Sequence, residues 1–181
     1  MKSRIVMLVS EFPKLSETFI QNRFHKLLAE GWDVHIVCHR SNSQERQVFP
    51  DLSQLPGAQR RVHTAWLQRP RGLALLLLPL ALLVGWLRAP SASLRYLRRG
   101  WPRFGLDTLR RFYLDLQLIL LKPALLHFEF GALAPERMYL KELLGCKILV
   151  SFRGYDLNFV GLEDPRHYQP VWQHSDALHL L

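Results

Sequence analysis

Signatures of several common enzyme classes are absent from this 181-residue chain. No Gly-x-Gly pair occurs, so the pyrophosphate-binding turn of dinucleotide enzymes is absent, and so is a GxxxxGK[ST] phosphate loop. There is no Asp-x-Asp pair that could hold a substrate through a metal ion, and the eight histidines are not clustered at zinc-ligand spacing. Hydride transfer, Walker-type ATP hydrolysis and metal-dependent hydrolysis are therefore disfavoured. We expect neither a metal nor a cofactor.

Cysteine and, in the middle of the chain, negative charge are also scarce. Cys38 and Cys146 are too few for a disulfide framework, which fits a reducing compartment such as the cytoplasm. Residues 60–111 contain eleven arginines, no lysine and one acid, Asp107. This segment therefore carries +10, and the remaining residues sum to −1, which gives the net charge of +9. It suits the phosphates of nucleic acid, of anionic lipid or of a phosphorylated substrate, or it forms ordinary solvated helix faces.

The longest hydrophobic run, residues 73–87, is too short to cross a bilayer. It has fifteen residues where a spanning helix needs about twenty, and it contains Pro79 and Gly85. We expect either a helix buried in the domain or one that lies on a membrane surface. Arg71, Arg88 and Trp86 would then face the membrane, because guanidinium and indole groups suit the headgroup boundary.

The remaining pattern predicts one α/β domain with a doubly wound, mostly parallel, Rossmann-like sheet flanked by helices. Ser16 is the expected N-cap of the first helix, with Glu17 in its first turn, and Gly31 is expected to end it. Further helices are expected over residues 91–99, 106–121, 135–144 and 165–174, besides the apolar run. The expected strands cover residues 4–10, 33–39, 61–67, 123–130, 147–152 and 177–181.

Three loops that follow strands, residues 10–18, 129–134 and 153–158, are the places to seek a site. In doubly wound sheets, ligands bind at the carboxyl ends of the strands, beside the switch in strand order. Strand alternation places His127 and Glu129 on one face, with Glu129 nearer the cleft and His127 a hydrogen-bonded histidine beneath a helix. The candidate site residues in these loops are Ser16, Glu17, Thr18, Glu129, Gly131, Arg153, Gly154 and Asp156.

Three stretches carry a family resemblance: "SEFPKLSETFIQNRFHKLLAEGWDVHIV" (10–37), "LLHFEFGALAPE" (125–136) and "VSFRGYDLN" (150–158). In order and position they resemble the N-terminal half of a family-4-type glycosyltransferase with the GT-B fold. The nearest subgroup is that of bacterial colanic-acid and exopolysaccharide transferases. The resemblance extends over essentially the whole chain and is weakest between about residues 40 and 121.

The resemblance implies a retaining, metal-independent transfer of sugar from a nucleotide-sugar donor to a polysaccharide or lipid-linked acceptor. The N-terminal domain of such enzymes mainly receives the acceptor, and a second domain binds the donor. Paired glutamates at Glu-x7-Glu, which belong to that second domain, do not occur here. The chain stops at "SDALHLL", a strand without its helix, so we expect residues 1–181 to be one acceptor-side domain that is inactive alone.

Two site positions depart from the relatives' pattern. Ser16-Glu17-Thr18 stands where many relatives have a Gly-Gly turn. We expect Ser16 and Thr18 to face the cleft and Glu17 to bind sugar hydroxyls or orient the loop; the alternative is a plain capped helix.

Arg153 stands where relatives often have the histidine of His-Gly-x-Asp. Arginine cannot act as a general base, but it can stabilise phosphate charge or bind an acidic sugar. Gly154 suits a tight turn or a backbone close to a ligand. Asp156 would brace Arg153 or bind acceptor hydroxyls; the alternative is a surface Arg–Asp pair on a turn.

Two functions from other classes compete with sugar transfer. A nucleic-acid-binding domain would use the arginines, but the chain lacks an RNA-stacking motif and a polar recognition helix, so no nucleic-acid partner is expected. A non-catalytic membrane-surface or carbohydrate-binding module is the other alternative. For the enzyme, the expected location is the cytoplasm, peripheral at the inner face of the plasma membrane.

Overall fold

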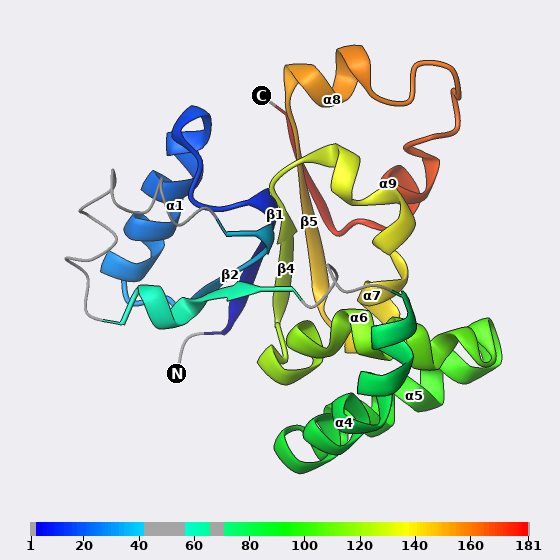
Figure 1. Ribbon diagram of the computed structural model, residues 1–181. Helices are drawn as coiled ribbons and strands as arrows, with labels where there is room; N and C mark the ends of the chain where they lie inside the picture. Colours follow the sequence, from blue (N-terminus) through cyan, green and yellow to red (C-terminus); the bar gives the residue numbers. More distant parts are fainter. Residues whose placement is uncertain (1–2, 42–56, 66–70, 181) are drawn as a thin grey trace.

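Six parallel strands form a single sheet in the order β3-β2-β1-β4-β5-β6. The structure is a computed structural model and describes residues 3–41, 57–65 and 71–180 (Figure 1). The expected α/β, doubly wound, Rossmann-like fold is confirmed. The strands are β1 (Ile5–Glu11), β2 (Val34–Arg40), β3 (Val62–Thr64), β4 (Leu125–Phe128), β5 (Lys147–Phe152) and β6 (Ala177–Leu180).

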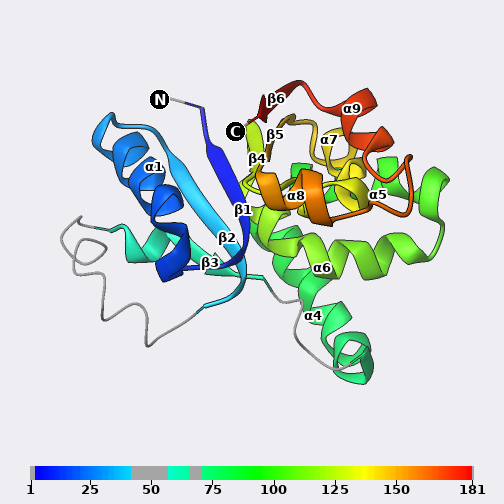
Figure 2. The ribbon, with the colours of Figure 1, turned by 90° about the horizontal axis from the view of Figure 1, so that it is seen from above.

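Helices cover both faces of the sheet. In Figure 2 α1 lies on one side of β1 and β2, and α6 with its neighbouring helices lies on the other. The core is divided in the same way: Met7 and Phe24 belong to one buried cluster, and Leu8 and Phe112 to the other. The helices are α1 (Thr18–Ala29), α4 (Arg71–Arg88), α5 (Pro90–Phe104), α6 (Asp107–Leu121), α7 (Tyr139–Leu144), α8 (Gly154–Phe159) and α9 (Gln169–His174).

The switch in strand order falls between β1 and β4. Met7 of β1 pairs with Ile36 of β2 on one side and with His127 of β4 on the other. The connection from β1 through α1 runs to β2, whereas the connection from β3 crosses back over the sheet to β4. The carboxyl ends of β1, β4 and β5 therefore meet at the position where doubly wound sheets bind ligands.

Most element boundaries agree with the sequence pattern to within a few residues, including the start of α1, but the residue expected to cap that helix is wrong. Ser16 is not its N-cap: Leu15–Glu17 forms a separate 3-10 turn, in which the Glu17 amide donates to the Lys14 carbonyl, 3.0 Å. The helix begins at Thr18 and has no side-chain cap. Its end is as expected, because Gly31 follows the C-cap with φ of 76°, a conformation that favours glycine.

Two other expectations are revised by the structure. Of residues 153–158, expected as loop, all but the first belong to the short helix α8, which ends at Phe159. The expected third strand reduces to Val62–Thr64, and residues 66 and 67 lie outside the described residues, as does the last residue expected in β6.

The apolar run forms α4, which packs against α6 on its Ala81 and Gly85 side. Among the described residues, no helix combines the length and the apolarity needed to cross a bilayer.

Candidate functional site

A buried carboxylate, Glu129, lies immediately after β4 at the switch point. Its side chain has no exposed surface. Nη1 of Arg23, from α1, donates to both carboxylate oxygens at 2.9 and 2.8 Å. Nη2 of Arg153, from the loop after β5, lies 3.4 Å from Oε2. One carboxylate thus joins residues from three elements that are far apart in the sequence.

Aromatic rings hold Arg153 in position. Its guanidinium carbon lies 3.5 Å from the centre of the Phe19 ring and 5.5 Å from that of Phe130. The two rings pack edge to face, with their centres 6.4 Å apart. A guanidinium over aromatic faces gains a cation–π attraction that strengthens when water is excluded. Partial burial lowers the pKa of Arg153, although the Glu129 carboxylate opposes this effect.

The cluster formed by Arg23, Glu129 and Arg153 carries an excess of positive charge. Burial raises the pKa of the Glu129 carboxyl, and the two guanidinium groups oppose that effect. The arginine side chains are partly exposed, 29% for Arg23 and 18% for Arg153, whereas the carboxylate is enclosed. The surface that the cluster offers to a ligand is therefore cationic and suits phosphate or carboxylate oxygens.

A chain of hydrogen bonds extends from Glu129 along the sheet. Nδ1 of His127 lies 3.1 Å from Oε1 of Glu129, and Nε2 lies 2.8 Å from the Ser151 hydroxyl, which is 3.2 Å from Nδ1 of His179. Because the carboxylate only accepts, His127 carries its proton on Nδ1 and accepts from Ser151 through Nε2. Burial, with the charge of Arg23, lowers the pKa of His127 to about 3. His127 is thus a buried, neutral, hydrogen-bonded histidine, as its strand position indicated.

Asp156 joins the loops that follow β4 and β5. Its carboxylate accepts from the Ala132 amide at 3.0 Å and from the Arg153 amide at 2.9 Å, and the residue is fully buried. The structure therefore favours the bracing role among the two roles expected for Asp156. Gly131 makes the same region compact, since a Cβ there would lie 2.5 Å from the Phe152 ring.

The three residues predicted at the first loop differ from one another in exposure. Ser16 and Thr18 are exposed, while Glu17 is buried and forms an ion pair with Lys14 of its own loop, 2.6 Å. Glu17 Oε2 has no hydrogen-bond partner among the described residues.

Gly154 begins α8, and a Cβ there would meet only Asn158, at 3.7 Å, so packing within the domain does not require a glycine.

Sequence reasoning missed two residues of the site, Phe19 and Arg23. They are four positions apart on α1, so they share one face of the helix that follows β1. An aromatic and a basic residue at this spacing, beside a switch point, were the available signal. The pairing of Arg23 with Glu129, which is 106 positions away, had no signal in the sequence.

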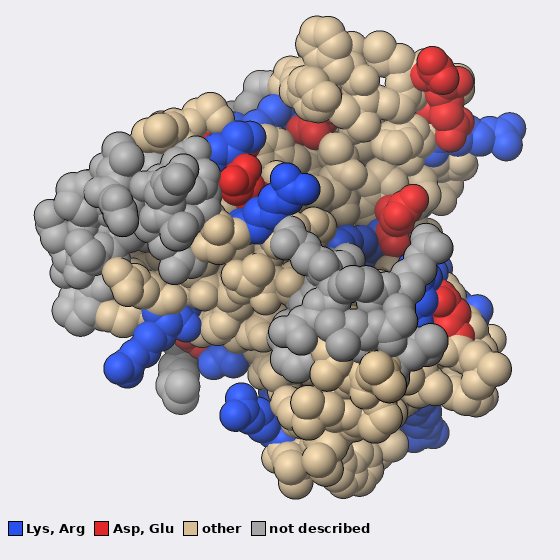
Figure 3. Space-filling model, in the orientation of Figure 1, with Lys and Arg blue, Asp and Glu red and all other residues tan. Residues whose placement is uncertain are grey.

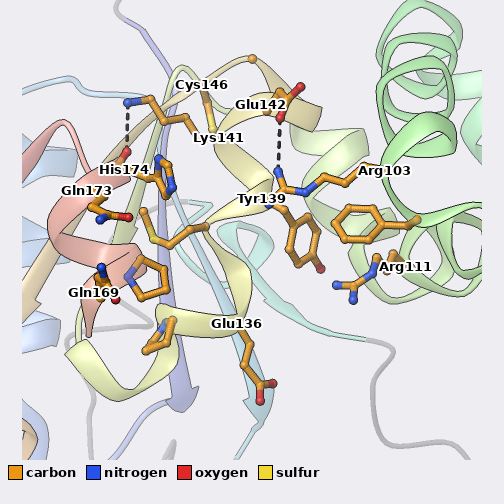
Figure 4. A pocket seen from close by; sticks show the side chains of 15 residues that line it. Arg103, Arg111, Glu136, Tyr139, Lys141, Glu142, Cys146, Gln169, Gln173 and His174 are labelled. Carbon is orange, nitrogen blue, oxygen red and sulfur yellow. Dashed lines mark hydrogen bonds and ion pairs between the residues drawn. The ribbon is translucent and has the colours of Figure 1, made fainter. Parts of the chain in front are cut away.

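A cavity of about 880 Å³ lies apart from this cluster, and none of the predicted site residues line it. It runs along α7 to Gly145, just before β5. Arg111 packs over the Phe104 and Tyr139 rings on one side, and His174 lies on the other (Figure 4). Since ligands of doubly wound sheets bind at the carboxyl ends of strands, the Arg23–Glu129–Arg153 cluster remains the better candidate.

The predicted membrane-facing residues lie on α4. Trp86 and Arg88 are exposed, and the side chain of Arg71 lies outside the described residues. In the described part of the chain, no group of three or more His, Cys, Asp or Glu residues is arranged to hold a metal ion.

Comparisons with protein-family models, with curated protein sequences and with solved structures give no match for this chain.

Proposed function

We propose that this chain is the N-terminal, acceptor-side half of a retaining, metal-independent glycosyltransferase. The whole enzyme would transfer a sugar from a nucleotide-sugar donor to a polysaccharide or lipid-linked acceptor in the synthesis of a bacterial surface polysaccharide. One observation carries the proposal: the residues after β4 and β5 converge with α1 on the Arg23–Glu129–Arg153 cluster at the switch point. This is a preorganised cationic surface where a donor diphosphate would have to lie.

When the bond from sugar to diphosphate breaks, negative charge grows on the leaving diphosphate. Fixed positive groups then stabilise the transition state more than the ground state. Arg153 and Arg23 would supply those groups, and the second domain would hold most of the donor. Glu129 is enclosed, so its role is to orient both arginines and not to bind sugar hydroxyls.

The three neighbouring loop residues have positioning roles in this proposal. Asp156 holds the loops after β4 and β5 together through two backbone amides. Gly131 permits the close packing against Phe152, and Gly154 leaves open space beside Arg153. Ser16 and Thr18 are exposed at the start of α1 and are available to an acceptor. The enzyme would act in the cytoplasm, at the inner face of the plasma membrane.

Sugar transfer by the complete gene product tests the proposal. Radiolabelled UDP- and GDP-hexoses are incubated with bacterial membranes that contain lipid-linked glycans, and incorporated label is measured. We expect Arg153→Gln and Arg23→Gln each to lower kcat by about 100-fold or more, as losses of charge-stabilising groups do. Arg110→Gln, on the exposed surface of α6, is the matched control.

Two results would contradict the proposal. One is a folded gene product that transfers no label from any of these donors; this would favour the non-catalytic carbohydrate-binding or membrane-surface module. The other is transfer that survives both arginine substitutions, since the cluster would then not be part of the site. Circular dichroism of each variant separates loss of activity from loss of fold.

A further inference from the structure

The outward face of α4 is apolar along its described length. Leu76, Leu80, Leu83 and Leu87 are exposed by 77, 47, 54 and 72%, at positions that form one stripe along a helix. Trp86, beside the stripe, is exposed by 55%. Large apolar patches of this kind mark binding surfaces in soluble domains and need a partner that covers them.

The opposite face of α4 is fixed to the core, so the helix cannot turn its leucines inward. Ala81 is fully buried. At Gly85, a Cβ would lie 2.6 Å from the Phe112 ring of α6 and 2.9 Å from the Ser93 hydroxyl of α5. A larger residue would not fit there, and α4 is thereby held in one rotational setting. The apolar stripe is a consequence of this packing.

Positive charge borders the stripe. Residues 71–104 include six arginines and no acidic residue. Arg88 is exposed at the end of α4, and Arg98 is exposed on α5 between Leu94 and Trp101, which share its face at spacings of four and three. In Figure 3 the lower end of the molecule, over α4, is mostly uncharged, with basic side chains at its margins. Arg99 and Arg103 bond to Glu142 of α7 instead.

We propose that this surface, the α4 stripe with Trp86, Arg88 and Arg98, binds the face of a bilayer that contains anionic phospholipid. The leucines and the indole would enter the boundary between headgroups and acyl chains, and the guanidinium groups would bond lipid phosphates. A second copy fits less well, because its docking would oppose two arginine-bordered surfaces that lack acids. A bilayer supplies both the apolar phase and the negative charge.

The proposal is independent of sugar transfer, since it stands on α4 and α5 alone. Co-sedimentation of the chain with vesicles tests it directly, using phosphatidylcholine alone and phosphatidylcholine mixed with phosphatidylglycerol. We expect binding to the mixed vesicles only. Leu80→Glu with Leu83→Glu should weaken it by about tenfold or more, because a carboxylate is costly in the acyl region. Leu162→Glu changes a leucine after α8 that is even more exposed, by 66%; it is the control and should bind as the unmodified chain does.

Two further measurements complete the test. Arg88→Gln with Arg98→Gln should weaken binding to the anionic vesicles by about 30-fold, because each of the two basic residues near such a surface adds about 1 kcal/mol. Trp86 fluorescence, taken as the difference between the unmodified chain and Trp86→Phe, should be quenched by lipids brominated on the acyl chain. The proposal is overturned if the paired leucine substitution leaves vesicle binding unchanged. It is also overturned if the chain is a dimer that this substitution dissociates.

Discussion

The guanidinium of Arg153 lies over the ring of Phe19, with 3.5 Å between the guanidinium carbon and the ring centre. This contact joins the loop after β5 to the first turn of α1, across the switch in strand order. This contact and the hydrogen bonds from Arg23 to Glu129 hold the cluster in place, and every side chain involved belongs to this domain. The cluster is therefore preorganised before any ligand arrives.

Removing the buried charge should destabilise the domain. Glu129→Gln leaves Arg23 and Arg153 facing an amide, and loss of one partner from a buried ion pair costs about 3 kcal/mol or more. Urea unfolding followed by circular dichroism measures this loss. The exposed Glu136→Gln serves as the control and should change stability by no more than about 0.5 kcal/mol. Equal stability of the two variants would show that Glu129 does not organise the cluster.

Substitution by alanine should lower the stability of the domain at one glycine of the site, Gly131, but not at the other, Gly154. In Gly131→Ala the new Cβ would meet the buried Phe152 ring at 2.5 Å, and overpacking of this kind costs about 1–3 kcal/mol. In Gly154→Ala the nearest atom is 3.7 Å away, so the folded state should tolerate the change. Thermal unfolding of both variants measures the difference. A Gly131→Ala protein as stable as Gly154→Ala would contradict the packing seen around Phe152.

The sequence was sufficient for the sheet because the signals that define it are local. Runs of apolar residues marked β1 and β5, and glycines with positive φ, Gly31 and Gly145, ended the helices as expected. The carboxyl ends of these strands could therefore be predicted as the candidate site from the sequence. Ser16 failed as an N-cap because the turn before α1 closes through backbone bonds, which side-chain type does not reveal.

Side-chain partnerships at the site were beyond sequence reasoning. Arg23 reaches Glu129 only because β4 pairs with β1, the strand that α1 follows, and this is a consequence of strand order and not of any nearby residue. The orientation of α4 could not be predicted either, because leucines occur on every side of this helix and its sequence does not indicate which of them face the core. The steric fit of Gly85 against Phe112 decides that, and it leaves the stripe outside.

Acid should destabilise the protein partly through His127. Its pKa is about 3 in the folded state, against about 6.5 when exposed, because burial and Arg23 disfavour the charged form. Between those values the unfolded chain binds a proton that the folded chain does not, so stability falls as pH drops from about 6.5 towards 3.

The slope for one such histidine is up to about 1.4 kcal/mol per pH unit. Urea unfolding at several pH values should give a smaller slope for His127→Asn than for the unmodified protein. His174→Asn, which removes an exposed histidine from α9, is the control for the loss of an imidazole that is not buried. If His127→Asn keeps the slope of the unmodified protein, His127 is not the buried neutral group described above.

The buried Asp115 of α6 should show strong coupling between its two tyrosine partners. The hydroxyls of Tyr96 and Tyr139 both donate to Oδ2, at 2.6 and 2.8 Å, and burial raises the pKa of this carboxyl. Tyr96→Phe removes one donor and should cost about 1–3 kcal/mol, whereas Tyr155→Phe on the exposed face of α8 should cost little.

Because Tyr96 and Tyr139 share one oxygen, the double variant tests the arrangement more sharply than either single change. Tyr96→Phe with Tyr139→Phe leaves Oδ2 of Asp115 without either hydroxyl donor, in a residue that is 4% exposed. The combined loss of unfolding free energy should therefore differ from the sum of the single losses by at least about 0.5 kcal/mol. A cycle of the four proteins under urea measures that difference. Strict additivity would mean that the two hydroxyls do not act on one carboxylate oxygen, contrary to the geometry at α5, α6 and α7.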